Sequence, residues 1–146
     1  MQLRAAATAV VYKQRAMPEL NIPAILLATI VAFAVSGAYY ARLGPTLARL
    51  SPVYAEPGGM GQATIAFELG RSFVVALALA GLCAGLDLDG TVQAVLLGLT
   101  LWVAFPVVLL LGSVVHERVQ PPLAAIHAGD WLLKLVAIAV IVTVWR

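Results

Sequence analysis

Four long apolar stretches constrain this chain more than any other feature of its sequence. They cover about residues 22–43, 64–86, 91–115 and 123–145, and each is close to the ~20 apolar residues with which a helix crosses a bilayer. Inside a bilayer a segment must satisfy its own backbone hydrogen bonds, and no stretch alternates polar and apolar residues as a barrel strand would. The sequence therefore predicts an all-α protein: an integral membrane bundle of four transmembrane helices in an antiparallel, up-down arrangement.

The composition agrees with a chain that is surrounded by lipid. Hydrophobic residues make up 62% of the 146 positions and charged residues 11%, whereas a soluble domain carries about a quarter charged residues. The formal net charge of +2 does not indicate a nucleic-acid partner, because the sequence has no run of lysine and arginine and basic residues commonly flank membrane spans. We expect the lipid bilayer as a partner, and no nucleic acid.

The connections predict how the spans follow one another. Residues 44–61 contain three prolines and a pair of adjacent glycines, which favours an irregular loop. The sequence from Asp87 to Gly90 favours a tight turn, in which Asp89 caps the next helix and Gly90 eases the reversal. The second and third helices should therefore form a hairpin. Pro106 lies inside the third stretch and is expected to kink it.

Small residues recur at every fourth position in the first two stretches, and in a membrane such rows allow helix backbones to approach closely. They are Ala24, Ala28, Ala32 and Ser36 in the first stretch, and Ala76, Ala80 and Ala84 in the second, beside the pair Gly81 and Gly85. The rows predict packing within one bundle, with a homodimer through the same rows as the alternative. The single Cys83 fits no metal or redox spacing and is expected to be a small apolar side chain in a helix.

Residues 1–21 form an N-terminal extension ahead of the first span. We expect residues 22–43 to be a retained helix, because a signal peptide has an apolar core of only ~7–15 residues. Met17 precedes the first span closely, as a native start would. Four spans place both termini on one side, and each side then carries four basic residues, whereas a start at Met17 leaves one against four. By the positive-inside rule, the second count places the termini outside.

Side chains that could carry chemistry gather at one membrane face. Because consecutive helices alternate in direction, the ends of the first and third spans meet the starts of the second and fourth. The candidate ligand or cleft residues at this face are Tyr39, Tyr40, Arg42, Glu68, Arg71, His116, Glu117, Arg118, His127, Asp130 and Lys134. The opposite face offers little beyond Asp87, Asp89 and the chain ends. The distribution predicts a one-sided polar cleft or a salt-bridged network.

Two charge pairs are expected within this set. Lys134 falls near the bilayer midplane, where an unpaired charge costs at least about 3 kcal/mol, so we expect it to pair with Asp130 one turn away. Glu68 and Arg71 are likewise one turn apart. Such pairs either fix the register of the helices or line a cleft that binds an anion, a lipid headgroup or a proton.

The two histidines raise a different hypothesis. His116 and His127 lie at the same predicted level and could act as axial haem ligands. However, they belong to helix ends, and the sequence has no paired histidines on facing helices and no cluster of cysteine and histidine. No serine belongs to a nucleophile motif. We expect no cofactor, no metal and no catalytic residue, and favour a protein that is not an enzyme.

Three segments are similar to parts of a known family. They are residues 36–44, residues 116–121 and the final helix, which ends in Trp145. The first resembles the small-residue, aromatic-pair end of a helix, with Tyr39 where the family often has tryptophan, and the second resembles a glutamate-plus-basic step. The family is the bacterial domain-of-unknown-function family numbered 1761. The resemblance implies four helices in a bacterial inner (cytoplasmic) membrane and supplies no reaction, ligand or catalytic residue.

Functions from three classes remain open at this point. An accessory or structural membrane protein, which binds itself or a larger membrane protein, agrees best with the small-residue rows, the short loops and the lack of a catalytic set. A small transporter or a lipid- or anion-binding protein would use the one-sided polar cleft. A membrane enzyme or redox protein would use His116 or His127.

Overall fold

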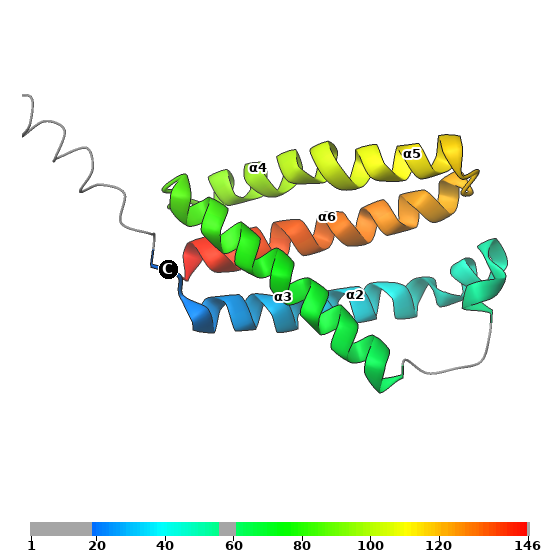
Figure 1. Ribbon diagram of the computed structural model, residues 1–146, viewed down its shortest axis with the longest axis horizontal. Coiled ribbons are helices and arrows are strands. Elements are labelled where there is room, and N and C mark those ends of the chain that lie inside the picture. The colour runs from blue at the N-terminus through cyan, green and yellow to red at the C-terminus, as the bar shows by residue number, and fades with distance from the viewer. Residues whose placement is uncertain (1–18, 56–60, 146) are drawn as a thin grey trace, which may run out of the picture.

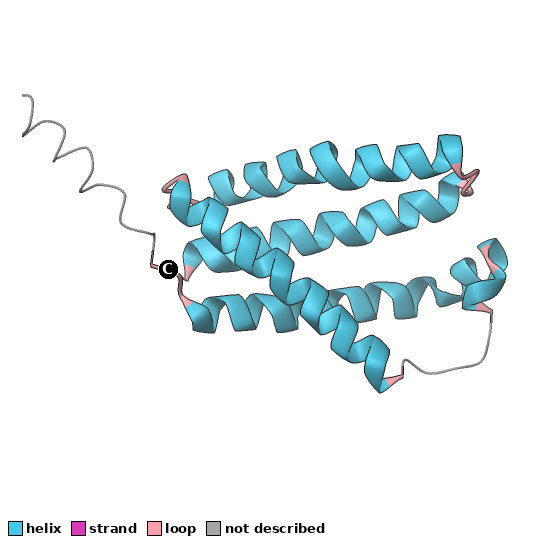
Figure 2. Cartoon of the chain, viewed as in Figure 1, coloured by secondary structure: helices cyan, strands magenta, loops and turns pink. Residues whose placement is uncertain are grey.

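The computed structural model describes residues 19–55 and 61–145, and the regular structure in these ranges is helical throughout (Figure 1, Figure 2). Its elements are α2 (Ile22–Leu50), η1 (Pro52–Tyr54), α3 (Gln62–Gly85), α4 (Thr91–Trp102), the π-helical η2 (Val103–Val107), α5 (Val108–His116) and α6 (Pro121–Val144). The three elements α4, η2 and α5 continue one another as a single span, Thr91–His116. The described residues thus contain four helices long and apolar enough to cross a membrane, which confirms the predicted bundle. The expectation about Met17 lies outside the described residues.

The helix α6 is the centre of the bundle. It packs against α2, against α3 and against the span formed by α4, η2 and α5, while α2 also packs on α3. A tight turn joins α3 to α4, yet the two helices diverge from it and make almost no contact with each other; α3 instead crosses the bundle obliquely (Figure 1). The two helices of the predicted hairpin are therefore held together through α6 rather than against each other.

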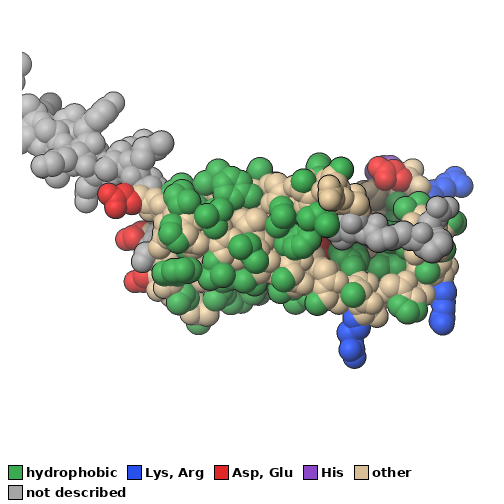
Figure 3. Space-filling view, turned by 90° about the horizontal axis from the view of Figure 1, so that it is seen from below, with side chains coloured by type: hydrophobic (Ala, Val, Ile, Leu, Met, Phe, Trp, Pro, Cys, Tyr) green, Lys and Arg blue, Asp and Glu red, His purple; other side chains and the backbone are tan. Residues whose placement is uncertain are grey.

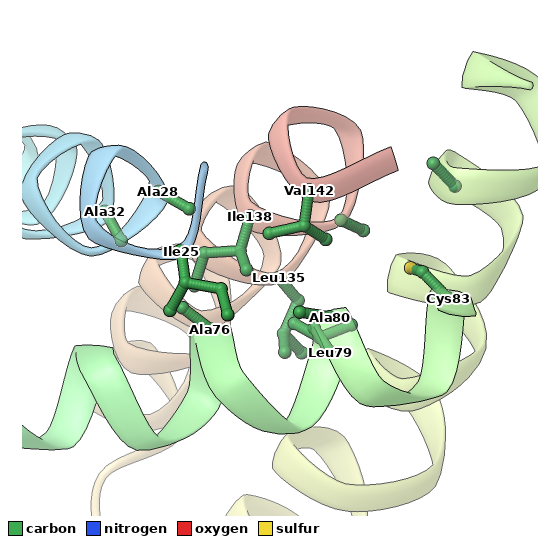
Figure 4. Packing of buried hydrophobic residues seen from close by; sticks show 12 residues of the cluster. Ile25, Ala28, Ala32, Ala76, Leu79, Ala80, Cys83, Leu135, Ile138 and Val142 are labelled. Carbon is green, nitrogen blue, oxygen red and sulfur yellow. The ribbon is translucent and has the colours of Figure 1, made fainter. Parts of the chain in front are cut away.

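The core lies where α2, α3 and α6 meet, and it is built largely from small side chains (Figure 4). Ala28 of α2, Ala76 of α3 and Ile138 of α6 are fully buried, which confirms that the small-residue rows pack within one bundle. The pair Gly81 and Gly85 is different, because a Cβ added at either glycine would meet nothing within 4 Å. Among the residues that the structure describes, the space beside this pair is therefore open.

The contact between α4 and α6 depends on one glycine. A Cβ at Gly98 would lie 3.1 Å from the Val136 Cα and 3.2 Å from the Leu135 carbonyl oxygen, so the two backbones approach closely. One turn further along the span, the Trp102 indole N–H donates to the Ala128 carbonyl, at 2.7 Å. The two helices are thus fixed both by close packing and by a hydrogen bond.

The helix α2 is longer than expected. It continues to Leu50 instead of ending near residue 43, so Pro45 lies inside the helix and the predicted loop at 44–61 begins later. The 29 residues of α2 span ~43 Å at 1.5 Å per residue, more than the ~30 Å of the hydrocarbon core. The turns around the exposed Pro45 can therefore lie outside the hydrocarbon, where water replaces the backbone hydrogen bond that proline removes.

Two local expectations about the α3–α4 region are corrected. Asp89 does not cap α4; the N-cap is Gly90, and the Gln93 side chain accepts from the Asp89 and Gly90 backbone N–H groups, at 3.2 and 3.3 Å. The left-handed residue in the turn is Asp87, with φ of 52°, rather than Gly90.

Pro106 lies within the π-helical η2, whose wider turn accommodates a residue that cannot donate a backbone hydrogen bond.

Candidate functional site

The centre of the candidate site is a buried ion pair on α6. The Lys134 ammonium lies 3.2 Å from the Asp130 Oδ2, and the two residues are only 4% and 1% exposed. Lys134 is ~20 Å from the start of α6 at 1.5 Å per residue, close to the middle of the span. The expected pair is confirmed, and its members are one helical turn apart because side chains at i and i+4 share a face.

The neighbouring helices extend this pair into a cluster of four charges. The Ser36 hydroxyl of α2 donates to the Asp130 Oδ1. From α3, the Glu68 Oε2 lies 3.8 Å from the Lys134 ammonium and 2.5 Å from the Arg71 Nη2. We call Asp130, Lys134, Glu68 and Arg71 the charge cluster. Its charges alternate in sign and sum to zero, so each cation has an anionic neighbour.

An aromatic ring covers both cations of the charge cluster. The Trp131 ring centroid lies 5.4 Å from the Arg71 Cζ and 5.8 Å from the Lys134 Nζ, within the range of cation–π attraction. Ser36 and Trp131 were not among the predicted site residues. The sequence placed Ser36 in a small-residue row and gave no signal that α2 would present it to Asp130.

A second group of polar contacts lies toward the start of α6. The Tyr40 hydroxyl lies 2.7 Å from the His127 Nδ1, and the Tyr54 hydroxyl lies 3.3 Å from its Nε2. The Tyr39 hydroxyl donates to the Ile126 carbonyl at 3.1 Å, in the space left by the missing side chain of Gly129. Tyr54 comes from η1 and was missed, because the sequence predicted an irregular loop there.

The remaining candidates lie at the same end of the bundle but outside the charge cluster. Arg42, His116, Glu117 and Arg118 are all exposed. Figure 3 shows basic side chains projecting from this end, with one acidic group beside them, whereas the charged side chains in view at the opposite end, where α3 turns into α4, are acidic. The structure therefore brings together seven of the eleven predicted residues: Tyr39, Tyr40, Glu68, Arg71, His127, Asp130 and Lys134.

The inner half of the charge cluster, Asp130 and Lys134, is almost completely buried, whereas the side chains of Arg71 and Glu68 are 38% and 24% exposed. The hollow beside Lys134, which Arg71 and Trp131 also line, is too narrow to admit a water molecule, and so it holds no substrate. A much larger groove of about 420 Å³ opens on the other side of Trp131, with an almost wholly apolar lining. The arrangement can therefore hold three helices in register, and it offers no polar chamber for chemistry.

Of three comparisons with known proteins, only the comparison with family models gave a match. Residues 23–143 match the model of a family described as "Protein of unknown function (DUF1761)". The comparison with curated proteins found no match, and neither did the comparison with solved structures.

Proposed function

We propose a function from the chain's own structure, because the chain belongs to the DUF1761 family, whose description assigns no activity. The protein is a multi-pass membrane protein. Its function is that of an accessory protein that binds another membrane protein, rather than that of an enzyme or a carrier of small substrates.

The observation that carries this proposal is the burial of the Asp130–Lys134 pair within the charge cluster. Charged groups within a membrane that bind a substrate face a cavity or a water-filled path. Here Asp130 and Lys134 are almost completely buried, each charge has an opposite charge within 4 Å, and the adjoining hollow is too narrow for a water molecule. Charges that satisfy one another stabilise the arrangement of α2, α3 and α6 and leave function to the outer surface.

The transport and redox alternatives have weaker support. Transport through the charge cluster would require α3 to move away from α6, which would break the contact between Glu68 and Lys134. Axial ligation by His127 would require the loss of at least one tyrosine contact, since both of its ring nitrogens contact tyrosine hydroxyls. His116 is exposed at the end of α5, away from the charge cluster.

Extraction of the full-length protein from its source membrane in a mild detergent, followed by native mass spectrometry, tests this proposal. We expect a defined complex that contains a second protein in fixed stoichiometry. A protein that is recovered only as a bare monomer, over a range of detergents that preserve other membrane complexes, would contradict the accessory role.

We further propose that the chain lies in a bacterial cytoplasmic membrane with its basic end, where the α5–α6 loop lies, in the cytoplasm. Exposed Arg42, Arg49 and Arg118 lie at that end, and Asp87 and Asp89 at the other. Short loops rich in arginine remain on the cytoplasmic side, whereas acidic residues have little influence on orientation. This orientation places both termini outside.

Cysteine labelling in intact cells tests the orientation. Cys83 is buried, so the background from a membrane-impermeant maleimide should be low. We expect Asp89→Cys to react from outside and Glu117→Cys to react only after the membrane is permeabilised. Both substitutions remove an exposed acidic side chain, which makes them matched. The reverse pattern would place the termini inside.

A further inference from the structure

The ion pair of Glu68 and Arg71 on α3, which we call the outer pair, lies deep within the membrane. The Arg71 guanidinium is held 5.4 Å from the Trp131 ring centroid and is bonded to Glu68. Trp131 is ~15 Å along α6 from its start, and the whole of α6, with its 24 residues, is ~36 Å long at 1.5 Å per residue. Since the hydrocarbon core is ~30 Å thick, the outer pair lies well inside it.

Some polar atoms of the outer pair have no partner in the chain. The Arg71 Nη2 donates to the Glu68 Oε2, but a guanidinium has five N–H donors. Within residues 19–55 and 61–145, the Arg71 Nε and Nη1 and the Glu68 Oε1 have no hydrogen-bond partner. In the same ranges the Thr143 hydroxyl is the only side-chain group that is both buried and unpartnered. The free atoms of the outer pair are therefore exposed on the outer surface of the bundle.

Exposure of these atoms at this depth is costly in a lone chain. Hydrocarbon offers neither an acceptor for an N–H group nor a donor for a carboxylate oxygen, and charged groups inside membranes face protein or a water-filled cavity. The hollow beside Arg71 is too narrow for water, and phospholipid headgroups lie outside the hydrocarbon. The missing hydrogen-bond partners must therefore belong to another membrane-spanning segment.

The outer pair is complementary to a second copy of itself. Its free N–H groups need an acceptor and its free carboxylate oxygen needs a donor, and the same two residues of another copy offer both. Two copies inserted in the same orientation carry their outer pairs at the same depth. A twofold axis along the membrane normal then places Arg71 of each copy opposite Glu68 of the other. The four charges sum to zero, so no net charge is left in the hydrocarbon.

The surface of α3 around the outer pair allows a second helix to approach. Phe67, Gly70 and Val74 are exposed, and their spacing of three and four residues places them on one face of the helix. A Cβ at Gly70 would meet nothing within 4 Å, and small residues let transmembrane helices come close. Because α3 crosses the bundle obliquely (Figure 1), two copies of α3 would cross each other, with a short contact beside the outer pair.

We propose that two copies of the chain associate through the exposed face of α3, with Arg71 of each copy hydrogen-bonded to Glu68 of the other. Asp130 and Lys134 stay behind this contact and hold the helices of each copy. The association needs only the chain itself, so it is independent of the partner protein proposed above.

Removal of the outer pair tests the contact. The full-length protein, expressed alone and purified in dodecylmaltoside, is expected to be a dimer in native mass spectrometry. Glu68→Gln/Arg71→Met removes one charge of each sign and should raise the Kd of the dimer about tenfold or more, because charge-assisted hydrogen bonds are lost. Glu117→Gln/Arg118→Met removes the same two charges from the exposed α5–α6 loop and should leave the Kd unchanged. A wild type that stays monomeric would overturn the proposal.

A second variant leaves the charges in place. Gly70→Leu adds a side chain where the chain itself leaves free space, so the protein should fold, but the leucine would hold a second α3 away and convert dimers into monomers. Gly112→Leu also adds a leucine to free space, on another span, and should keep the dimer. Equal dimer contents in these two variants would contradict an interface at this part of α3.

Mixing two single variants tests the reciprocal pairing itself. Glu68→Gln and Arg71→Met each lose both contacts in a dimer of identical chains. In a mixed dimer, Arg71 of the first variant faces Glu68 of the second, so one contact is restored. The two chains differ in mass, and native mass spectra should show more mixed dimers than the half that random pairing gives. A mixed fraction of one half or less would overturn the pairing of Arg71 with Glu68 across the interface.

Discussion

Lys134→Met is expected to destabilise the bundle by about 3–5 kcal/mol, the cost of leaving a buried charge without its partner. Asp130 is 1% exposed and would keep its hydrogen bond from the Ser36 hydroxyl but lose the Lys134 ammonium. Methionine keeps the length and apolar character of the lysine stem, so lost packing contributes little. Equilibrium unfolding in mixed micelles of dodecyl sulfate and dodecylmaltoside, followed by circular dichroism, measures the change.

The double variant Asp130→Asn/Lys134→Met is the control for this prediction. It removes one positive and one negative charge together and leaves Glu68 paired with Arg71. A neutral asparagine can still accept from Ser36, so the double variant should be much closer to the wild type than Lys134→Met is. Equal losses in the single and double variants would show that burial of unpaired charge is not what destabilises the single variant.

Gly98→Leu should have the second largest effect. Its Cβ would already lie 3.1 Å from a backbone atom of α6, so α4 must move away from α6 as a whole. Overpacking of this kind costs about 1–3 kcal/mol, and the Trp102 hydrogen bond to Ala128 would also be lengthened. The same unfolding assay, with tryptophan fluorescence as a second signal, measures the loss.

Gly112→Leu provides the matched comparison for Gly98→Leu. It lies in the same transmembrane span, but a Cβ there would meet nothing within 4 Å. This variant should keep the stability of the wild type, since the added side chain faces free space. A loss of stability as large as that of Gly98→Leu would mean that the effect arises from adding a side chain to the span and not from the contact with α6.

The four spans and the ion pair on α6 could be predicted because they depend on local sequence. Apolar length determines which segments cross the membrane, and the spacing of four residues places Asp130 beside Lys134 on any helix. The family was identified from short segments and is confirmed by a match over residues 23–143. These inferences need no knowledge of how the helices pack.

The rest depends on tertiary geometry that one sequence does not reveal. Whether Glu68 reaches Lys134 depends on the crossing of α3 over α6. Tyr54 reaches His127 because α2 continues to Leu50 and η1 follows it, where the three prolines had favoured a loop. The divergence of α3 from α4 was not foreseen either, because a tight turn predicts packed neighbours, whereas here the short connection joins two helices that make almost no contact.

The central claim is that the charge cluster serves structure and that the outer surface of the bundle serves function. The measurement that tests it most directly is native mass spectrometry of the Asp130→Asn/Lys134→Met variant, extracted from source membranes beside the wild type. We predict the same associated protein, in the same stoichiometry, for both. A double variant that is folded and inserted in the membrane but has lost that partner would contradict the claim and make the charge cluster the functional site.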